Sequence, residues 1–178
     1  MSCVVIGIDP GKDGAMVVLD HTGKTVMSYL TKSDFTIKIG TKRSKRVYTE
    51  SRMAQAIAWI NERHEIRLAT IEKQGARPGQ GVSSMFSSGL GYGLWRGVLA
   101  GLNIKILEVH PKTWTKRILR DVAGTGKGRS VYVASQRVPD LNLTPGARRK
   151  PHDGLSDAAC IALYGMSTLS MSEPDAGI

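Results

Sequence analysis

Four acidic residues in three short segments have the types and spacing for metal-ion chemistry. They are Asp9, Glu72, Asp153 and Asp157. Asp9 and Glu72 each end an apolar run that has the pattern of a buried strand. The last two lie four residues apart at the head of an apolar segment, so a helix would project them from one face. Buried carboxylates are costly unless they are paired or bound to a cation, and oxygen ligands suit Mg²⁺, so the pattern predicts a divalent metal site.

The predicted chemistry is hydrolysis of a phosphodiester. If the strands ending in Asp9 and Glu72 are parallel neighbours, both side chains emerge at the carboxyl edge of the sheet, where sites form in open α/β folds. Two metal ions roughly 3.5–4 Å apart can clamp the attacking and leaving oxygens and lower the pKa of the attacking water. We therefore expect two Mg²⁺ ions per site and no Ser or Cys nucleophile.

Each acid also has a purely structural explanation. Asp9 precedes Pro-Gly and can form a turn, and Glu72 can pair with its neighbour Lys73. Asp153 can stabilise the first turn of its helix, and Asp157 can be a solvated helical acid. Without a metal site, all four of these explanations would have to be true at once in a chain with only 15 acidic residues. That coincidence is improbable, and the metal site is therefore favoured.

Composition points to a polyanionic partner. The chain has 178 residues, of which 41% are hydrophobic, and a net charge of +10. Its length predicts one domain over 1–168, followed by a disordered tail at 169–178. There is no apolar run of about 18 residues and the first apolar run is too short for a signal peptide, so nucleic acid is favoured over a membrane.

The two cysteines, Cys3 and Cys160, are too few and too scattered for a disulfide framework, which predicts buried thiols in a reducing compartment.

The order of elements predicts an α/β domain. Strands are expected over 3–9, 15–20, 25–30, 67–72 and 104–109, and helices over 50–63, 82–101, 111–120, 130–138 and 153–168. Short glycine-containing turns join the first three strands, which indicates antiparallel pairing, and a helix precedes the fourth, which favours pairing parallel to the first. The fold is thus a five-stranded mixed sheet, three antiparallel strands and then two parallel ones, with helices on both faces. Segment 31–49 is basic and is expected to be a loop or an excursion at the edge of a strand.

The segment Gly124–Gly128 has some features of a phosphate-binding P-loop. The match fails, since Asp121 stands where the first glycine is required and Lys127 is followed by Gly rather than Ser or Thr. We interpret the segment as a flexible basic loop.

Several of these segments together resemble the RuvC-type Holliday-junction resolvases of the RNase H-like superfamily. The matching stretches are Ile6–Gly11 with Gly14-Ala15, Ile71–Gln74, Pro78–Phe86, Gly91–Trp95, Val109–Trp114 and Asp157–Leu163. The resemblance spans 3–165. It implies a homodimeric endonuclease of DNA recombination and repair, which nicks opposed strands of a four-way junction symmetrically with Mg²⁺ or Mn²⁺. The implied setting is the cytoplasm of a bacterial or phage-infected cell, or another reducing compartment that contains DNA.

The resemblance implies that Asp9, Glu72 and Asp157 bind metal. It leaves open which residue is the fourth metal ligand. The family's last two ligands lie three residues apart, whereas position 154 is Gly here, so Asp153 and His152 are the alternatives. The family also has an aromatic residue three positions after the strand-end Glu, and here that position is Gly75. The family dimerises through the region of 82–101, whose small residues would permit close approach; packing of that helix on its own sheet is the alternative.

Basic runs near the predicted acid edge are candidates for contacts with DNA phosphates, which position the nucleic acid without reading its sequence. The candidates are Lys42, Arg43, Lys45, Arg46, Arg77, Lys112, Lys116, Arg117, Arg148, Arg149 and Lys150. Arg77 and Gln80 follow Glu72 and are expected near the junction centre. Two other functions fit the sequence: a nuclease for RNA–DNA hybrids with the same fold, and a junction-binding protein without catalysis.

Overall fold

The computed structural model describes residues 1–41, 44–76 and 78–172 of the chain. Its strands are β1 (Ser2–Asp9), β2 (Ala15–Asp20), β3 (Thr25–Leu30), β4 (Thr36–Ile39), β5 (Lys45–Tyr48), β6 (His64–Glu72) and β7 (Ile106–Val109). Its helices are α1 (Thr31–Asp34), α2 (Glu50–Arg63), α3 (Val82–Gly101), α4 (Pro111–Ile118), α5 (Gly128–Arg137) and α6 (Asp153–Ser172).

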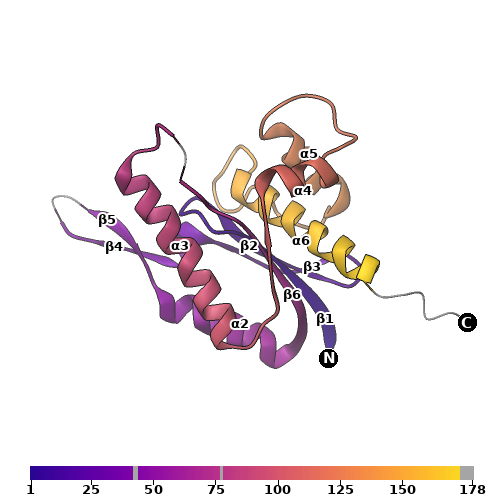
Figure 1. Cartoon of the computed structure of the whole chain (residues 1–178), viewed down its shortest axis with the longest axis horizontal. Coiled ribbons are helices and arrows are strands. Elements are labelled where there is room, and N and C mark those ends of the chain that lie inside the picture. Colours follow the sequence, from indigo (N-terminus) through magenta and orange to yellow (C-terminus); the bar gives the residue numbers. More distant parts are fainter. Residues whose placement is uncertain (42–43, 77, 173–178) are drawn as a thin grey trace, which may run out of the picture.

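A five-stranded mixed sheet forms the centre of the molecule (Figure 1), with the strand order β3-β2-β1-β6-β7. β1 pairs antiparallel with β2, and β2 with β3, whereas β6 is parallel to β1 and β7 is parallel to β6. The predicted sheet of three antiparallel and two parallel strands is confirmed.

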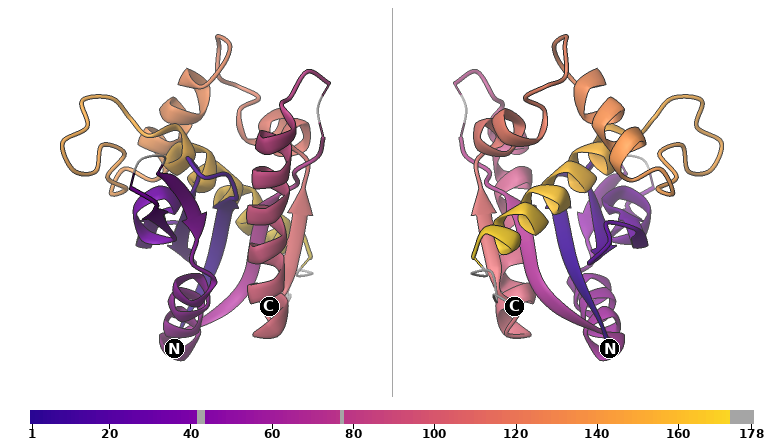
Figure 2. Two further views of the ribbon diagram at one scale, coloured as in Figure 1. Left: turned by 90° about the vertical axis from the view of Figure 1, so that its left-hand side faces the viewer. Right: turned by 90° about the vertical axis from the view of Figure 1, so that its right-hand side faces the viewer.

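Helices cover both faces of this sheet. On one face α2 and α3 bury Met53, Ile57 and Trp95 against the strands. On the other face α4, α5 and α6 form a second core, and Ala158 and Ile161 of α6 are fully buried in it. Figure 2, right, shows α6 lying across the strands.

The close approach of α6 to β1 depends on Gly7. A Cβ added there would lie 2.8 Å from the Cα of Ala162 and closer still to the backbone oxygen of Ala158. Any side chain at Gly7 would therefore push α6 away from the sheet. This contact sets the height of α6 above β1, and with it the position of the acids at the start of α6.

Segment 31–49, expected to be a loop or an excursion at a strand edge, contains regular structure of its own. It contains the single turn α1 and a hairpin in which Ile37 pairs with Val47 and Ile39 with Lys45. Ile37 and Ile39 are each 40% exposed, so the alternation typical of strands does not bury a continuous apolar face. The lysines and arginines of the segment interrupt the apolar pattern by which a strand is predicted from sequence.

The tail also differs from the prediction. α6 continues to Ser172, four residues beyond its expected end, so 169–172 are helical rather than disordered. The hydroxyls of Ser167, Thr168 and Ser170 donate to carbonyls one turn earlier, which keeps this polar end of the helix hydrogen-bonded. The rest of the predicted tail, 173–178, lies outside the described residues. In the part of the chain that the structure describes, no helix is long and apolar enough to cross a membrane.

Candidate active site

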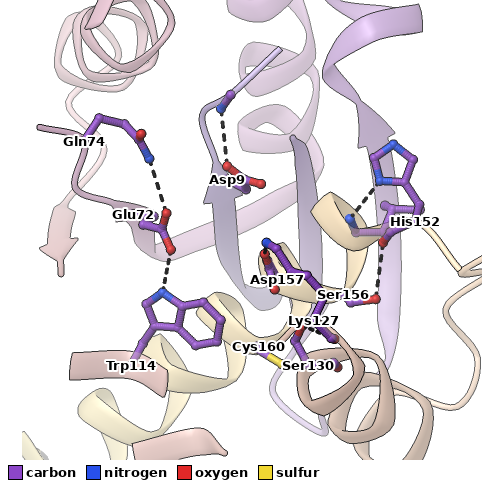
Figure 3. A network of polar contacts seen from close by, with 12 residues as sticks. Asp9, Glu72, Gln74, Trp114, Lys127, Ser130, His152, Ser156, Asp157 and Cys160 are labelled. Carbon is purple, nitrogen blue, oxygen red and sulfur yellow. Dashed lines mark hydrogen bonds and ion pairs between the residues drawn. The ribbon is translucent and has the colours of Figure 1, made fainter. Parts of the chain in front are cut away.

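Asp9 and Glu72 end two neighbouring parallel strands and therefore lie side by side. Ile8 of β1 is in register with Ile71 of β6, so the next residue of each strand emerges at the same carboxyl edge. Asp157, on the second turn of α6, faces this edge from above β1 (Figure 3). We call Asp9, Glu72 and Asp157 the acid cluster.

The three carboxylates of the acid cluster affect one another electrostatically. The pKa of Asp9 is raised to about 7, first by burial and then by the charges of Glu72 and Asp157, while the hydrogen bond from the Gly11 N–H and the charge of Lys127 act in the opposite direction. The pKa of Glu72 is also raised, first by burial and then by the charge of Asp157. Such mutual repulsion is what a bound cation would relieve.

Glu72 is held by two hydrogen bonds. The indole N–H of Trp114 donates to its Oε2 at 2.8 Å, and the amide of Gln74 donates to its Oε1 at 3.3 Å (Figure 3). Trp114 is only 3% exposed and belongs to the core, and the sequence did not predict its contact with Glu72. These bonds oppose the rise in the pKa of Glu72 and so favour its charged form.

Lys127 is a site residue that the sequence analysis missed. Its ammonium forms an ion pair with Asp157, which is itself only 6% exposed. Burial alone would lower the pKa of Lys127, but the hydrogen bond to Asp157 and the charges of Asp9 and Asp153 raise it. Gly124 and Gly126 have φ of 95° and 71°, left-handed conformations that let the segment turn back toward the acids. The rejected P-loop pattern marked this segment, but only the fold brings its lysine to Asp157.

Asp153 and His152, the two alternatives for the fourth metal ligand, are in different environments. Asp153 is exposed and lines a cavity of about 490 Å³ together with Asp9 and Lys127. His152 is 7% exposed, and its Nδ1 accepts a hydrogen bond from the Leu155 N–H at 3.3 Å. Its ring is turned away from Asp9 and Asp157 in Figure 3, and burial, with the nearby charge of Arg148, lowers its pKa. His152 thus caps the start of α6 as a neutral acceptor.

Two adjoining depressions meet at Asp9 and Lys127, which line both. One, of about 420 Å³, also contains Glu72, Trp114 and Asp157. The other contains Asp153 and a row of hydroxyls from the first half of α3: Ser84, Ser87 and Ser88. The acid cluster therefore lies at the floor of an open, polar cleft, and the serines give its second wall hydrogen-bond donors.

The cleft has the right donors for a hard divalent cation, since carboxylate oxygens are the ligands such ions prefer. Among the residues that the structure describes, however, no three His, Cys, Asp or Glu side chains are arranged to hold a metal ion. The ion pair of Lys127 with Asp157 occupies part of the acid cluster instead. The ammonium of Lys127 thus lies beside the carboxylates that the sequence predicted as metal ligands.

The predicted DNA-binding residues are spread over several surfaces. Lys42, Arg43 and Arg77 lie outside the described residues. Lys45, Lys112, Lys116, Arg117, Arg148, Arg149 and Lys150 are exposed. Gln80 lies beside the start of α3, where its amide donates to Ser84 at 3.2 Å. Arg46 is partly exposed, and its guanidinium donates to the Lys32 carbonyl at 2.6 Å and to the Thr36 hydroxyl at 3.0 Å, contacts that connect β5 to α1 and β4.

Comparison with known proteins identifies the fold. No family model matches the sequence, and no curated protein sequence is significantly similar to it. The structure is similar to Thermus thermophilus RuvC in complex with Holliday junction substrate, with a TM-score of 0.55 and 16% identity over 96% of this chain and 97% of that one. It is also similar to the fowlpox virus Holliday junction resolvase (TM-score 0.53, 18% identity, 93% and 99% of the two chains). The yeast mitochondrial Holliday junction resolvase Ydc2 is a third neighbour (TM-score 0.53, 14% identity, 94% and 80%). The chain therefore has the RNase H-like fold of the RuvC-type Holliday junction resolvases.

Proposed function

We propose that this protein is a divalent-metal-dependent endonuclease that resolves four-way DNA junctions by paired, symmetric nicks. The observation that carries the proposal is the convergence of Asp9, Glu72 and Asp157, from β1, β6 and α6, at the carboxyl edge of the sheet. The neighbours in fold support it, because all three are described as Holliday junction resolvases or as bound to such a junction. The net charge of +10 supports a polyanionic substrate.

The acid cluster would hold Mg²⁺ or Mn²⁺, and Asp153 is the candidate to complete a second ion's ligands. The chemistry that such ions supply is a water of lowered pKa and stabilisation of charge on the phosphodiester oxygens. Trp114 would keep Glu72 oriented, because its N–H fixes one carboxylate oxygen. Lys127 would leave Asp157 and place its ammonium beside a DNA phosphate in the same cleft.

The first half of α3 supports a homodimer. Val82, Phe86 and Leu90 are 79%, 72% and 42% exposed, and their spacing places them along one side of the helix. A Cβ added at Gly89, Gly93 or Gly97 would meet nothing within 4 Å, and these glycines continue the same side. In contrast, Gly91 packs against Tyr48 and Pro10 of its own chain. We propose that the α3 face, defined as Val82, Phe86, Gly89, Leu90, Gly93 and Gly97, contacts a second copy.

The decisive experiment is a side-by-side digestion of a four-way junction, a linear DNA duplex and an RNA–DNA hybrid. Each is incubated with Mg²⁺, with Mn²⁺ and with EDTA, and Asp9→Asn serves as the matched variant. We expect metal-dependent nicks at symmetric positions in opposed strands of the junction, and none with Asp9→Asn. Faster cleavage of the hybrid would instead identify a hybrid nuclease. Junction binding without cleavage in either metal would identify a binding protein.

A further inference from the structure

A basic groove is lined by residues of α4, the end of α5 and α6. These three helices lie on the side of the sheet opposite α2 and α3 (Figure 1). Its volume is about 750 Å³, larger than either depression at the acid cluster. Five cationic side chains line it: Lys112, Lys116, Arg117, Arg120 and Arg137. We call these five residues the basic groove.

The positive charge of the basic groove is nearly uncompensated. Among the residues that the structure describes, no acidic side chain lines it. Within the described part of the chain, Lys112, Lys116 and Arg137 form no ion pair, and Arg120 pairs only with its neighbour Asp121 at 3.2 Å. Both members of that pair are more than three-quarters exposed, so water and salt screen it. Five like charges around one concave surface create a field that attracts an anion with repeated charges.

One cation of the basic groove is already fixed in place. Arg117 lies over the ring of Tyr164, 5.5 Å from its centroid, and donates to the carbonyl of Ser167 at 3.1 Å. A guanidinium has five N–H donors, so these contacts orient Arg117 and leave donors for a phosphate. Lys112 and Lys116 are exposed, and lysine carries its point charge on a flexible side chain that can follow a phosphate backbone.

The basic groove and the acid cluster share one helix. Trp114 of α4 points inward to Glu72, while Lys112 and Lys116, two residues to either side, are exposed. α4 therefore lines the depression at the acid cluster with Trp114 and Thr115 and the basic groove with Lys112 and Lys116, so a nucleic acid that extends from the acid cluster past α4 would reach the groove. The groove is also concave and has no exposed large apolar residue, unlike a face that inserts into a membrane.

We infer that the basic groove binds the backbone phosphates of a duplex arm of the DNA substrate, away from the position of cleavage. The inference rests on the proposed function for the identity of the substrate. It adds Arg120 and Arg137 to the DNA contacts and assigns Lys112, Lys116 and Arg117 to one continuous surface. Because the contacts are to phosphates, this surface supplies affinity and orientation without sequence preference.

The test compares two double variants that each remove two positive charges. Lys116→Ala/Arg137→Ala removes them from the basic groove. Lys24→Ala/Lys105→Ala removes them from the opposite end of the sheet, where the β2–β3 turn and the start of β7 lie. Binding of an uncleaved four-way junction and of a linear duplex is measured in EDTA over a series of salt concentrations, after thermal melting has shown that both variants are folded.

The groove variant should bind both DNAs about tenfold more weakly near 0.15 M salt, and the slope of log K against log salt should fall by nearly 2, since each phosphate contact contributes about 0.9. The control variant should change affinity less than threefold. Equal losses in the two variants would overturn the inference, because net charge alone would then explain them. It would also be overturned if the groove variant lost binding to phosphatidylserine vesicles while retaining DNA binding.

The outcomes separate this inference from the proposed function. Binding in EDTA does not require cleavage, so a groove variant that loses DNA affinity supports the groove even if the wild-type protein cuts no junction. If the wild-type protein resolves junctions while the groove variant binds like the control, the groove inference fails and the proposed function stands.

Discussion

Lys127 and Asp157, which are thirty residues apart in the chain, form an ion pair at the centre of the cleft. The lysine side chain is 61% exposed, whereas that of the aspartate is 8% exposed. The ammonium also lowers the pKa of Asp9, so one exposed cation offsets part of the repulsion within the acid cluster. The protein therefore carries its own counter-cation where the proposed metal ion would bind.

Replacing Lys127 should make the protein more responsive to metal. Without metal at pH 8, Lys127→Met should unfold at a lower temperature, with a loss of about 1 kcal/mol, because the acids lose a cation that solvent already screens. Added Mg²⁺ should then raise its melting temperature more than that of the wild type, since no ammonium competes for Asp157. Lys73→Met, an exposed neighbour of Glu72, is the control. Equal Mg²⁺ stabilisation of the variant and the wild type would contradict this competition.

The hydrogen bond from Trp114 to Glu72 can be removed with little change in packing. Trp114→Phe keeps an aromatic ring in the core but loses the indole N–H, so Glu72 is less well oriented and its pKa rises. Outer contacts of this kind are typically worth 10–100-fold, so we expect junction cleavage to fall by about that factor. The variant's Mn²⁺ affinity, measured by calorimetry, should fall in parallel. Trp59→Phe, on the exposed side of α2, should leave both unchanged.

A cleavage rate for Trp114→Phe within threefold of the wild type would show that the orientation of Glu72 does not depend on this bond.

The raised pKa of Asp9 predicts how stability changes with pH. Its usual pKa is 3.8 and its folded value is about 7, so between these values the folded protein holds a proton that the unfolded chain has released. The free energy of unfolding must therefore fall as pH rises through this window. For Asp9 alone the loss is at most about 4 kcal/mol, from three pKa units at 1.36 kcal/mol each.

Asp9→Asn, which does not titrate, should lack that loss. Urea unfolding in EDTA at pH 5 and pH 8 should show the variant gaining stability relative to the wild type as pH rises. If the difference in unfolding free energy between the two proteins is the same at both pH values, the pKa of Asp9 is not raised.

His152 and Asp153 should respond to substitution in opposite ways. His152→Ala removes the acceptor of the Leu155 N–H, so it should cost about 1 kcal/mol of stability and leave the cleavage rate of the folded protein within threefold. Asp153→Asn should leave the unfolding midpoint nearly unchanged and slow cleavage by tenfold or more. Parallel urea unfolding and single-turnover cleavage would measure both. A folded His152→Ala protein that no longer cleaves would assign the fourth ligand to His152 instead.

The α3 face predicts a dimer that one substitution can weaken. Phe86→Ser removes the ring that is 72% exposed near the start of α3, and should shift the protein from dimer toward monomer at micromolar concentration. Trp59→Ser, which removes an aromatic residue that is 40% exposed on α2, is the matched control. Sedimentation velocity gives the mass of each. A monomeric wild-type protein, or two variants with the same mass as the wild type, would rule out this surface.

Several features followed from the sequence because they depend on neighbouring residues. The strands that end in Asp9 and Glu72, their parallel pairing and the helices over 50–63 and 82–101 all follow from apolar periodicity and from the length of the connections. The hairpin of β4 and β5 did not, since its apolar residues remain half exposed and basic residues outnumber them. The end of α6 was misplaced because serine and threonine are weak helix formers whose hydroxyls here bond back to the helix.

The sequence by itself determined the three carboxylates and the sheet edge at which two of them meet. Tertiary structure decided what surrounds them: Trp114 holds Glu72, Lys127 pairs with Asp157, and His152 turns inward to cap α6. Each of these contacts joins a side chain to a group on another element or to the start of its own helix. Their distances depend on how closely the helices pack on the sheet, and no periodicity or spacing along the chain encodes that packing.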